Sequence, residues 1–405
     1  MRYYRDPYGF LHACHAKYGD WFTVKQIPCG TIVYTADPEA VRLIFADPGN
    51  HLVGPINEYM APVLGKGLLL LDGEAHARDR RWLEPALANE RVNRLAAEIA
   101  ALTEAEVATW RIGETFALRP RFDALTLGVI VQVLFGAGAR SRLAELGPRV
   151  LQLKGRDIVK SVMATLPFGI AKWKLAGDAA RNAQAIDRIL FAELAARRAK
   201  TVSNDGMLGG MLADDPAATD RSLRDQLMTL IFAGHETVAA TLAWTFERVL
   251  RHPDVLAELK AGDERYTEAV LLETMRVRST IGDVARELAT PLEVNGQYLP
   301  VGTRVCPSLV LVHMRADLYS QPETFRPARF LDESKPKPWM YLPFGGGVRR
   351  CIGAAFAMVE MLTIVRVVLA RTTLRAASPA PERGVSNGVT IGPNKGALVM
   401  MQGRC

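Results

Sequence analysis

A short stretch near the C-terminus combines three glycines, two arginines and one cysteine. It reads Phe344-Gly345-Gly346-Gly347-Val348-Arg349-Arg350-Cys351-Ile352-Gly353. Successive glycines allow tight turns without Cβ atoms and let a flat ligand lie close to the main chain. The apolar residues from Ile352 to about Ala370 predict a helix whose N-terminus favours a negative charge on the preceding sulfur. The stretch therefore presents one thiolate to a large ligand.

Such a thiolate could be a nucleophile, a zinc ligand or the axial ligand of a haem. A nucleophilic cysteine needs a base, yet no histidine lies near Cys351 in the sequence. Zinc needs further sulfur or imidazole ligands, and no Cys-x-x-Cys or His-x-His spacing supplies them. Haem ligation is the hypothesis that remains.

The pattern Phe344-Gly345-x-Gly347-x-Arg349-x-Cys351-x-Gly353 resembles the haem-binding signature of the cytochrome P450 family. The resemblance implies haem b (iron protoporphyrin IX) as cofactor, with Cys351 as the axial ligand of the iron. It also implies that Phe344, Gly345, Arg349 and Gly353 bind the cofactor. The expected fold class is mainly α with small β-sheets (α+β), with one long central helix over the haem.

The longest predicted helix begins at a capping box, Ser222-x-x-Asp225, and runs to Arg251 before His252-Pro253. Its middle reads Ala233-Gly234-His235-Glu236-Thr237, where a glycine and polar residues interrupt an apolar run. This motif resembles the family's oxygen-binding groove. Ala233 and Gly234 are then cofactor-binding, and Glu236 and Thr237 are catalytic residues that deliver protons. The alternative for Thr237 is a hydroxyl bonded to its own helix. We interpret His235 as structural.

The resemblance also assigns two sets of charged residues. His76 and Arg80 lie four residues apart on one face of a helix that begins at Gly73, and with Arg286 they match ligands of the haem propionates. An ordinary solvated cationic face is the alternative for the first two. Glu273 and Arg276 are spaced to pair on the helix expected over 267–278, and in the family they form a structural network with Arg329 behind the haem.

The remaining elements position these residues. We expect them to form one cytochrome P450 domain over residues 1–405. Its β-rich portions are expected at about 20–50 and 280–310, and at 372–402. The local signals, in chain order, predict a helix over 7–18, a hairpin of 21–24 with 31–34, a helix from Pro38 to Phe45, successive helices over 89–200, a mobile linker over 201–219 and a hairpin around Asn295-Gly296.

Several apolar segments are predicted to line the substrate pocket. The loop over 50–72 carries four consecutive leucines, and the segment 161–175 is unusually apolar for a break between helices, although simple core packing also explains it. The individual candidates are Ile281, Asp283, Val284, Phe168 and Val389. We expect Asp283 to contact a polar end of the substrate, or otherwise to be a turn residue.

Composition limits the class of protein and its surroundings. The five cysteines, Cys14, Cys29, Cys306, Cys351 and Cys405, show no disulfide pattern, which indicates a reducing cytoplasm. The chain contains no run of eighteen apolar residues, so no membrane anchor is predicted. We therefore expect a soluble, cytoplasmic protein of bacterial type, and we expect it to be a monomer. The net charge of +7 comes with 43 acidic residues interleaved among 50 basic ones, which argues against nucleic acid as a partner.

Residues 324–352 carry six basic side chains against two acidic ones, a face that would steer an acidic electron carrier. An ordinary solvated surface explains the individual lysines equally well. The expected function is a haem-thiolate monooxygenase that hydroxylates a hydrophobic small molecule. It would use O2 and two electrons from a ferredoxin or flavodoxin with its NAD(P)H reductase.

A terpenoid or steroid substrate is favoured over a fatty acid, because the loop over 50–72 contains no arginine to hold a carboxylate. Two alternatives stay open. A peroxide-driven haem-thiolate peroxygenase would need no proton relay. A non-catalytic haem-binding sensor or transport protein would need no groove opposite the sulfur.

Overall fold

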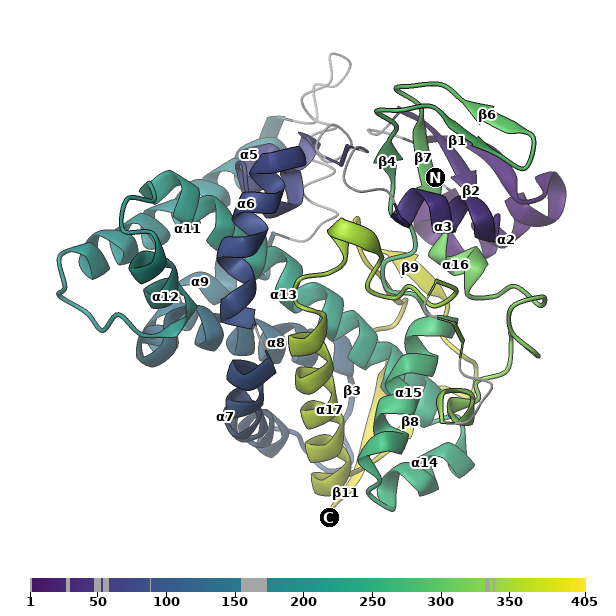
Figure 1. Ribbon diagram of the computed structural model, residues 1–405. Coiled ribbons are helices and arrows are strands. Elements are labelled where there is room, and N and C mark those ends of the chain that lie inside the picture. The colour runs from purple at the N-terminus through teal and green to yellow at the C-terminus, as the bar shows by residue number, and fades with distance from the viewer. Residues whose placement is uncertain are drawn as a thin grey trace.

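A computed structural model describes residues 2–26, 30–46, 52–53, 58–87, 89–153, 173–331, 336–337 and 339–405, without the side chains of residues 59, 89–94 and 173–180. Helices make up most of this part of the chain, and small sheets lie at its edges (Figure 1). The predicted fold class is therefore confirmed. Phe168 and most of the segment 161–175 lie outside the described residues.

The helices differ greatly in length. They are α1 (Arg2–Arg5), α2 (Pro7–Tyr18), α3 (Pro38–Ala46), α5 (Ala61–Leu64), α6 (Gly73–Leu83), α7 (Asn89–Ala108), α8 (Leu118–Phe135), α9 (Ala139–Val150), α11 (Trp173–Arg198), α12 (Gly206–Asp214), α13 (Asp220–Val249), α14 (Pro253–Lys260), α15 (Glu264–Val277), α16 (Leu309–Val312) and α17 (Ala354–Arg371). Short 3-10 turns are η1 (Glu58–Met60), η2 (Leu68–Leu70), η3 (Glu84–Leu87), η4 (Gly136–Gly138), η6 (Pro327–Phe330) and η7 (Gly347–Arg349).

The strands form four small sheets. One has the order β1 (Trp21–Gln26), β2 (Gly30–Thr35), β7 (Arg304–Pro307), β4 (Arg286–Glu287), with β2 and β7 parallel. A second has the order β3 (Thr115–Ala117), β11 (Leu398–Arg404), β8 (Thr372–Ala376). Two hairpins pair β5 (Leu292–Val294) with β6 (Gln297–Leu299), and β9 (Gly384–Ser386) with β10 (Ile391–Pro393). Apart from β3, these strands lie in the predicted β-rich portions.

The predicted Asn-Gly turn between β5 and β6 is present. Asn295 and Gly296 both have positive φ angles, 48° and 76°, as a two-residue hairpin turn requires. The N-terminal helix, the hairpin of β1 with β2, and α3 also lie where the sequence predicted them. These elements gather with the first sheet at one end of the molecule, around the N-terminus (Figure 1).

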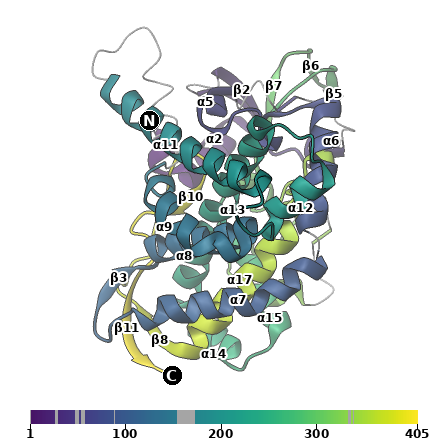
Figure 2. The same cartoon turned by 90° about the vertical axis from the view of Figure 1, so that its left-hand side faces the viewer.

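Helix α13 runs through the helical body and is about 45 Å long at 1.5 Å per residue. It packs against α8, α15 and α17, and most of its residues are buried (Figure 2). The predicted capping box is wrong. Thr219 caps the helix by accepting a hydrogen bond from the Ser222 backbone N–H at 3.1 Å. The Asp225 carboxylate instead accepts the backbone N–H of Lys66 at 2.8 Å.

The linker predicted over 201–219 is also wrong, because α12 lies within it. Met207, Leu208 and Met211 are buried on one side of this helix, which packs against α8. Asp205 fixes its start, since its carboxylate accepts the Ala137 N–H at 2.8 Å and its carbonyl accepts Arg197 Nη1 at 2.6 Å. Turn-forming residues in this stretch therefore flank a packed helix.

Two stretches are apolar and long enough to span a membrane, Leu118–Val150 and Asp220–Val249. Most of each is buried inside the fold, as in core helices of a globular protein.

The loop between α5 and α6 is fastened to the first turns of α13. Arg224 Nη2 donates to the Val63 carbonyl at 2.9 Å, and the Leu68 N–H donates to Gln226 Oε1 at 2.9 Å. Gly65, with φ +69°, lies so close that an added Cβ would be 2.0 Å from an oxygen of Asp225. The close approach therefore requires glycine at this position.

We predict that Gly65→Ala destabilises the protein more than Gly73→Ala. Both glycines have positive φ, which costs an alanine about 1–2 kcal/mol. Gly73 has open space around it, whereas Gly65→Ala must also displace the Asp225 carboxylate, which costs about 1–3 kcal/mol more. Thermal unfolding of both variants measures the difference, and equal losses would contradict the fastening of this loop to α13.

Candidate active site

The cysteine loop, residues 344–353, contains η7 and leads into α17. The Cys351 N–H donates to the Phe344 carbonyl at 2.9 Å, which closes the loop, and Gly345 and Gly347 adopt φ +68° and +63°. Gly346 lies against Phe45 of α3, where a Cβ would be 3.1 Å from that side chain. Helix α17 begins at Ala354, two residues later than predicted, with Gly353 at its N-cap.

The Cys351 side chain is exposed. Protein atoms nevertheless surround it closely enough that burial raises the pKa of its thiol above the ordinary value. The Gly353 N–H and the charges of Arg350 and Arg80 act in the opposite direction, as predicted from the helix N-terminus. Burial outweighs them, so the sulfur lies in a recess that a ligand can reach, and the helix alone does not ionise it.

Cations from three separate parts of the chain gather beside this recess. Burial, followed by Arg349 and Arg80, lowers the pKa of His76 to about 4. Arg80 Nη1 donates to the Arg350 carbonyl at 2.7 Å, and Arg349 donates to the Asp72 carboxylate. Arg286 of β4 also contributes to the depressed pKa of His76. The structure therefore unites four of the predicted cofactor-binding residues.

This cluster is not a solvated cationic face. His76 and Arg286 are each only 6 % exposed, and burial lowers the pKa of Arg349. Cations held together away from water favour a ligand that carries negative charge. A recess with one sulfur and a neighbouring cation cluster fits a haem, whose iron accepts a thiolate and whose propionates accept charged hydrogen bonds.

The middle of α13 has an open strip in an otherwise buried helix. Ala233 is exposed, and Gly234 and Thr237 are half-buried, while the residues on either side are buried. The Thr237 hydroxyl donates to the Ala233 carbonyl at 2.9 Å, so in this structure it bonds its own helix. Packing also favours glycine at position 234, because a Cβ there would lie 3.0 Å from Ile130 of α8. Packing against α8 therefore accounts for the glycine in addition to the predicted groove.

Glu236 lies apart from that strip. It is buried, and Oε1 accepts the Thr390 hydroxyl at 2.8 Å and lies 3.6 Å from Nη2 of Arg119. Neither partner was identified from the sequence, because both lie far away in the chain. His235 is structural, as predicted: it is buried, and its Nδ1 lies 2.7 Å from the Ile231 carbonyl oxygen.

The predicted network around Glu273 is present. Arg276 Nε lies 2.7 Å and Arg329 Nε 3.4 Å from Glu273 Oε2, and all three side chains are buried. Arg276 also donates to the His313 carbonyl at 2.8 Å. His313, missed by the sequence analysis, accepts the Leu342 N–H on Nε2 at 3.0 Å, and burial lowers its pKa to about 3. The network thus extends to the start of the cysteine loop.

Two of the predicted pocket segments are joined. The Ile391 N–H donates to the Thr280 carbonyl at 2.8 Å, which places the turn between β9 and β10 beside the segment that follows α15. Ile281, Val284 and Val389 are each half-buried. Their contact with a substrate stays a prediction.

Asp283 belongs to a polar cluster that the sequence did not indicate. Its Oδ2 accepts the hydroxyls of Tyr3 and of Tyr34, the latter at 3.1 Å. Its Oδ1 is buried and has no hydrogen-bond partner among the described residues. Asp283 also forms a single bridge with Ser308, so it is not a simple turn residue. Burial raises its pKa to about 6 against the opposing effect of the two tyrosines. The substrate contact stays a prediction alongside this structural role.

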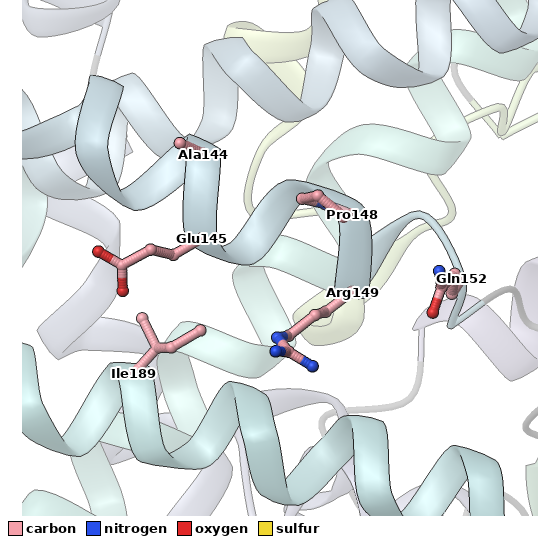
Figure 3. Close-up of a pocket in the computed structure, with 6 residues that line it drawn as sticks. All are labelled: Ala144, Glu145, Pro148, Arg149, Gln152 and Ile189. Atoms are coloured by element: carbon pink, nitrogen blue, oxygen red, sulfur yellow. The ribbon is translucent and has the colours of Figure 1, made fainter.

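A separate surface groove of about 500 Å³ lies between α9 and α11 (Figure 3). It is lined by Ala144, Glu145, Pro148, Arg149, Gln152 and Ile189. None of these is a predicted site residue. The groove therefore shares no residue with the site described around Cys351.

The fold and the recess together define a haem-thiolate protein. Comparison with known sequences agrees: the family model for cytochrome P450 matches residues 2–398. A putative cytochrome P450 135B1 from Mycobacterium tuberculosis is 37% identical over 97% of this chain and 87% of that protein. A putative cytochrome P450 138 from the same species is 35% identical over 96% of this chain and 90% of that protein. This chain belongs to the cytochrome P450 family.

Solved structures agree on the fold. The haem domain of cytochrome P450DA has a TM-score of 0.85 at 21% sequence identity, covering 98% of this chain and 93% of that one. Retinoic acid-bound cyanobacterial CYP120A1 has a TM-score of 0.86 at 21% identity, covering 97% and 94%. The protein is therefore a haem b enzyme, a monooxygenase that uses O2 and electrons from a redox partner.

We predict that Asp283 makes stability depend on pH between about 6 and 4. Its pKa is higher in the folded protein than its ordinary 3.8, so the folded state binds the proton more tightly. The free energy of unfolding should rise, by up to about 1.4 kcal/mol per pH unit, as pH falls through this window. Asp283→Asn should remove this slope.

Asp317 is the matched control, because hydrogen bonding to Arg315 lowers the pKa of its carboxyl. Asp317→Asn should change the pH dependence in the opposite sense, and only below about pH 4. Chemical denaturation from pH 8 to about pH 3 measures both. An unchanged slope in Asp283→Asn would show that Asp283 is not buried as described.

Proposed function

We propose that this enzyme hydroxylates a neutral, hydrophobic small molecule, with a terpenoid or steroid favoured over a fatty acid. One oxygen atom of O2 would enter a C–H bond of the substrate. A ferredoxin or flavodoxin with its NAD(P)H reductase would supply two electrons. The observation that carries the proposal is the exposed Cys351 in a recess beside a buried cation cluster.

Each part of the haem has a partner in this proposal. The Cys351 sulfur would hold the iron, and His76, Arg80, Arg286 and Arg349 would bind the propionates. The other proposed cofactor-binding residues would contact the haem from two elements: Phe344, Gly345 and Gly353 from the cysteine loop, and Ala233 and Gly234 from α13. The haem, when bound, supplies the redox chemistry that activates dioxygen.

Two residues of α13 would deliver the protons. Thr237 lies on the open strip, where its hydroxyl can exchange the bond to the Ala233 carbonyl for one to a ligand or water. Glu236, one residue earlier, is the acid of the pair. Glu273, Arg276 and Arg329 take no part in the chemistry and hold the cysteine loop in place.

The substrate class is supported by the side chains of the two joined segments. Ile281, Val284 and Val389 are apolar and half-buried, so they can exchange contact with water for contact with an apolar ligand. The loop over 50–72 contains no arginine to pair with a carboxylate, which favours terpenoid or steroid.

The electron carrier is proposed to be acidic, but the basic surface is smaller than the sequence suggested. Arg329 is buried against Glu273, and Arg349 is bonded to Asp72. Arg350 and Lys337 are exposed and remain available to steer a partner. A soluble, cytoplasmic monomer is the form proposed for this reaction.

The first test is the absorption spectrum of the dithionite-reduced protein with carbon monoxide. Wild type should show the red-shifted Soret band of thiolate ligation, and Cys351→Ser should lose it. Cys14→Ser is the matched control, because that cysteine is also partly accessible but distant from the haem-binding loop in sequence. A histidine-like band in the wild type would overturn the assignment of Cys351.

The substrate class is tested by titrating the ferric enzyme with a panel of terpenoids, steroids and fatty acids. We expect spin-state shifts with neutral polycyclic or terpenoid compounds, and at least about tenfold weaker responses to fatty acids, whose carboxylate would lack a charged partner. Tighter binding of fatty acids would contradict the substrate proposal. Turnover with hydrogen peroxide alone, at the rate seen with a reductase, would contradict the need for an electron partner.

A further inference from the structure

The turn between β9 and β10 is attached to α13 at two points. The Thr390 hydroxyl donates to Glu236 Oε1 at 2.8 Å, and the Trp244 indole N–H donates to the Ile391 carbonyl at 3.0 Å. Thr390 is 1 % exposed, so this bond is shielded from water. Its neighbour Val389 is half-buried and is one of the proposed substrate contacts. One short turn therefore reaches both the acid and the pocket lining.

Arg119, the second partner of Glu236, packs against the same hairpin of β9 and β10. Arg119 lies against β10, where a Cβ on Gly392 would be 2.9 Å from its Nη1. Its Nε donates to Asp123 at 2.7 Å, and its Nη2 donates to the Glu236 carbonyl at 3.1 Å. Nη1 is buried and has no hydrogen-bond partner among the described residues. Arg119 therefore places a positive charge beside the Glu236 carboxylate. Asp123 neutralises only part of that positive charge.

We propose that Thr390 and Arg119 are positioning residues for proton delivery, and that Thr390 links the substrate pocket to the acid. This inference rests on the proposed role of Glu236. Because Glu236 is buried away from the open strip, its carboxylate must be oriented by the groups that hold it. Thr390 is the only hydroxyl recorded on that carboxylate in the described part of the chain. A substrate that presses on Val389 would move the adjacent Thr390 and change that orientation.

The order of events follows from this connection. With the pocket empty, Thr390 and Arg119 keep the Glu236 carboxylate on the side of α13 that faces away from the open strip. Substrate contact with the turn moves the Thr390 hydroxyl, and the carboxylate that this hydroxyl holds turns with it to exchange protons toward Thr237. Proton delivery would then be efficient mainly when substrate is bound, which limits the diversion of electrons to peroxide.

The test uses four variants of the holoenzyme. Thr390→Val removes the hydroxyl with little change in shape, and Thr390→Ser restores it. Glu236→Gln removes the acid. Thr126→Val is the matched control, because Thr126 is also a fully buried threonine beside this part of α13, but its hydroxyl bonds only the Phe122 and His235 carbonyls.

Two readouts are needed. The first is the melting temperature, in a double-mutant cycle of Thr390→Val with Glu236→Gln. If the two side chains interact as described, their losses will not add, whereas those of Thr126→Val and Glu236→Gln will. The second is the share of electrons that yields product rather than peroxide, together with the solvent isotope effect on turnover.

We expect Thr390→Val to lower coupled turnover about fivefold and to change the solvent isotope effect. Thr390→Ser should match wild type, and Thr126→Val should lose stability without uncoupling. The positioning proposal is overturned if Thr390→Val keeps wild-type coupling while Glu236→Gln loses it, and the proposed function then stands. If Glu236→Gln itself stays fully coupled, the catalytic role of Glu236 is wrong, and this inference falls with it.

Discussion

Repulsion among cations is the constraint on which the site depends. His76, Arg80, Arg286 and Arg349 come from α6, β4 and the cysteine loop, and they meet where water is scarce. Burial is the main cause of the lowered pKa values of His76 and Arg349, and neighbouring arginines add to it. His76 is therefore neutral near pH 7, and the repulsion is among the three arginines. A ligand with two carboxylates relieves the repulsion. In the proposed function, the charges of the cofactor would thus help to hold together three segments that the chain itself places far apart.

A second buried network holds the position of the cysteine loop relative to α15. The fully buried pair of Glu273 and Arg276 connects α15 to the segment around His313, and His313 in turn binds the backbone at Leu342. A buried ion pair adds little stability over an apolar contact, but removing one partner leaves a charge without compensation. Its main consequence is specificity: the cysteine loop has one position relative to α15 rather than several.

The sequence by itself determined the parts that depend on neighbours along the chain. The glycines around Cys351, the Asn295-Gly296 turn and the spacing of Glu273 with Arg276 all act through backbone preference or helical periodicity. These effects operate over a few residues and are visible without a fold. The same local reasoning was wrong over 201–219, where tertiary packing of α12 overrides turn-forming composition.

Only the tertiary structure decided which side chains meet across the fold. The bond between Thr390 and Glu236, the position of Arg119 beside them, and the two tyrosines on Asp283 join residues that are more than a hundred positions apart. No periodicity or motif indicates such pairs, because the sequence around each residue shows only the ordinary preferences of its own helix, strand or loop. Burial then determines their chemistry, since a carboxylate removed from water must find its partners wherever packing places them.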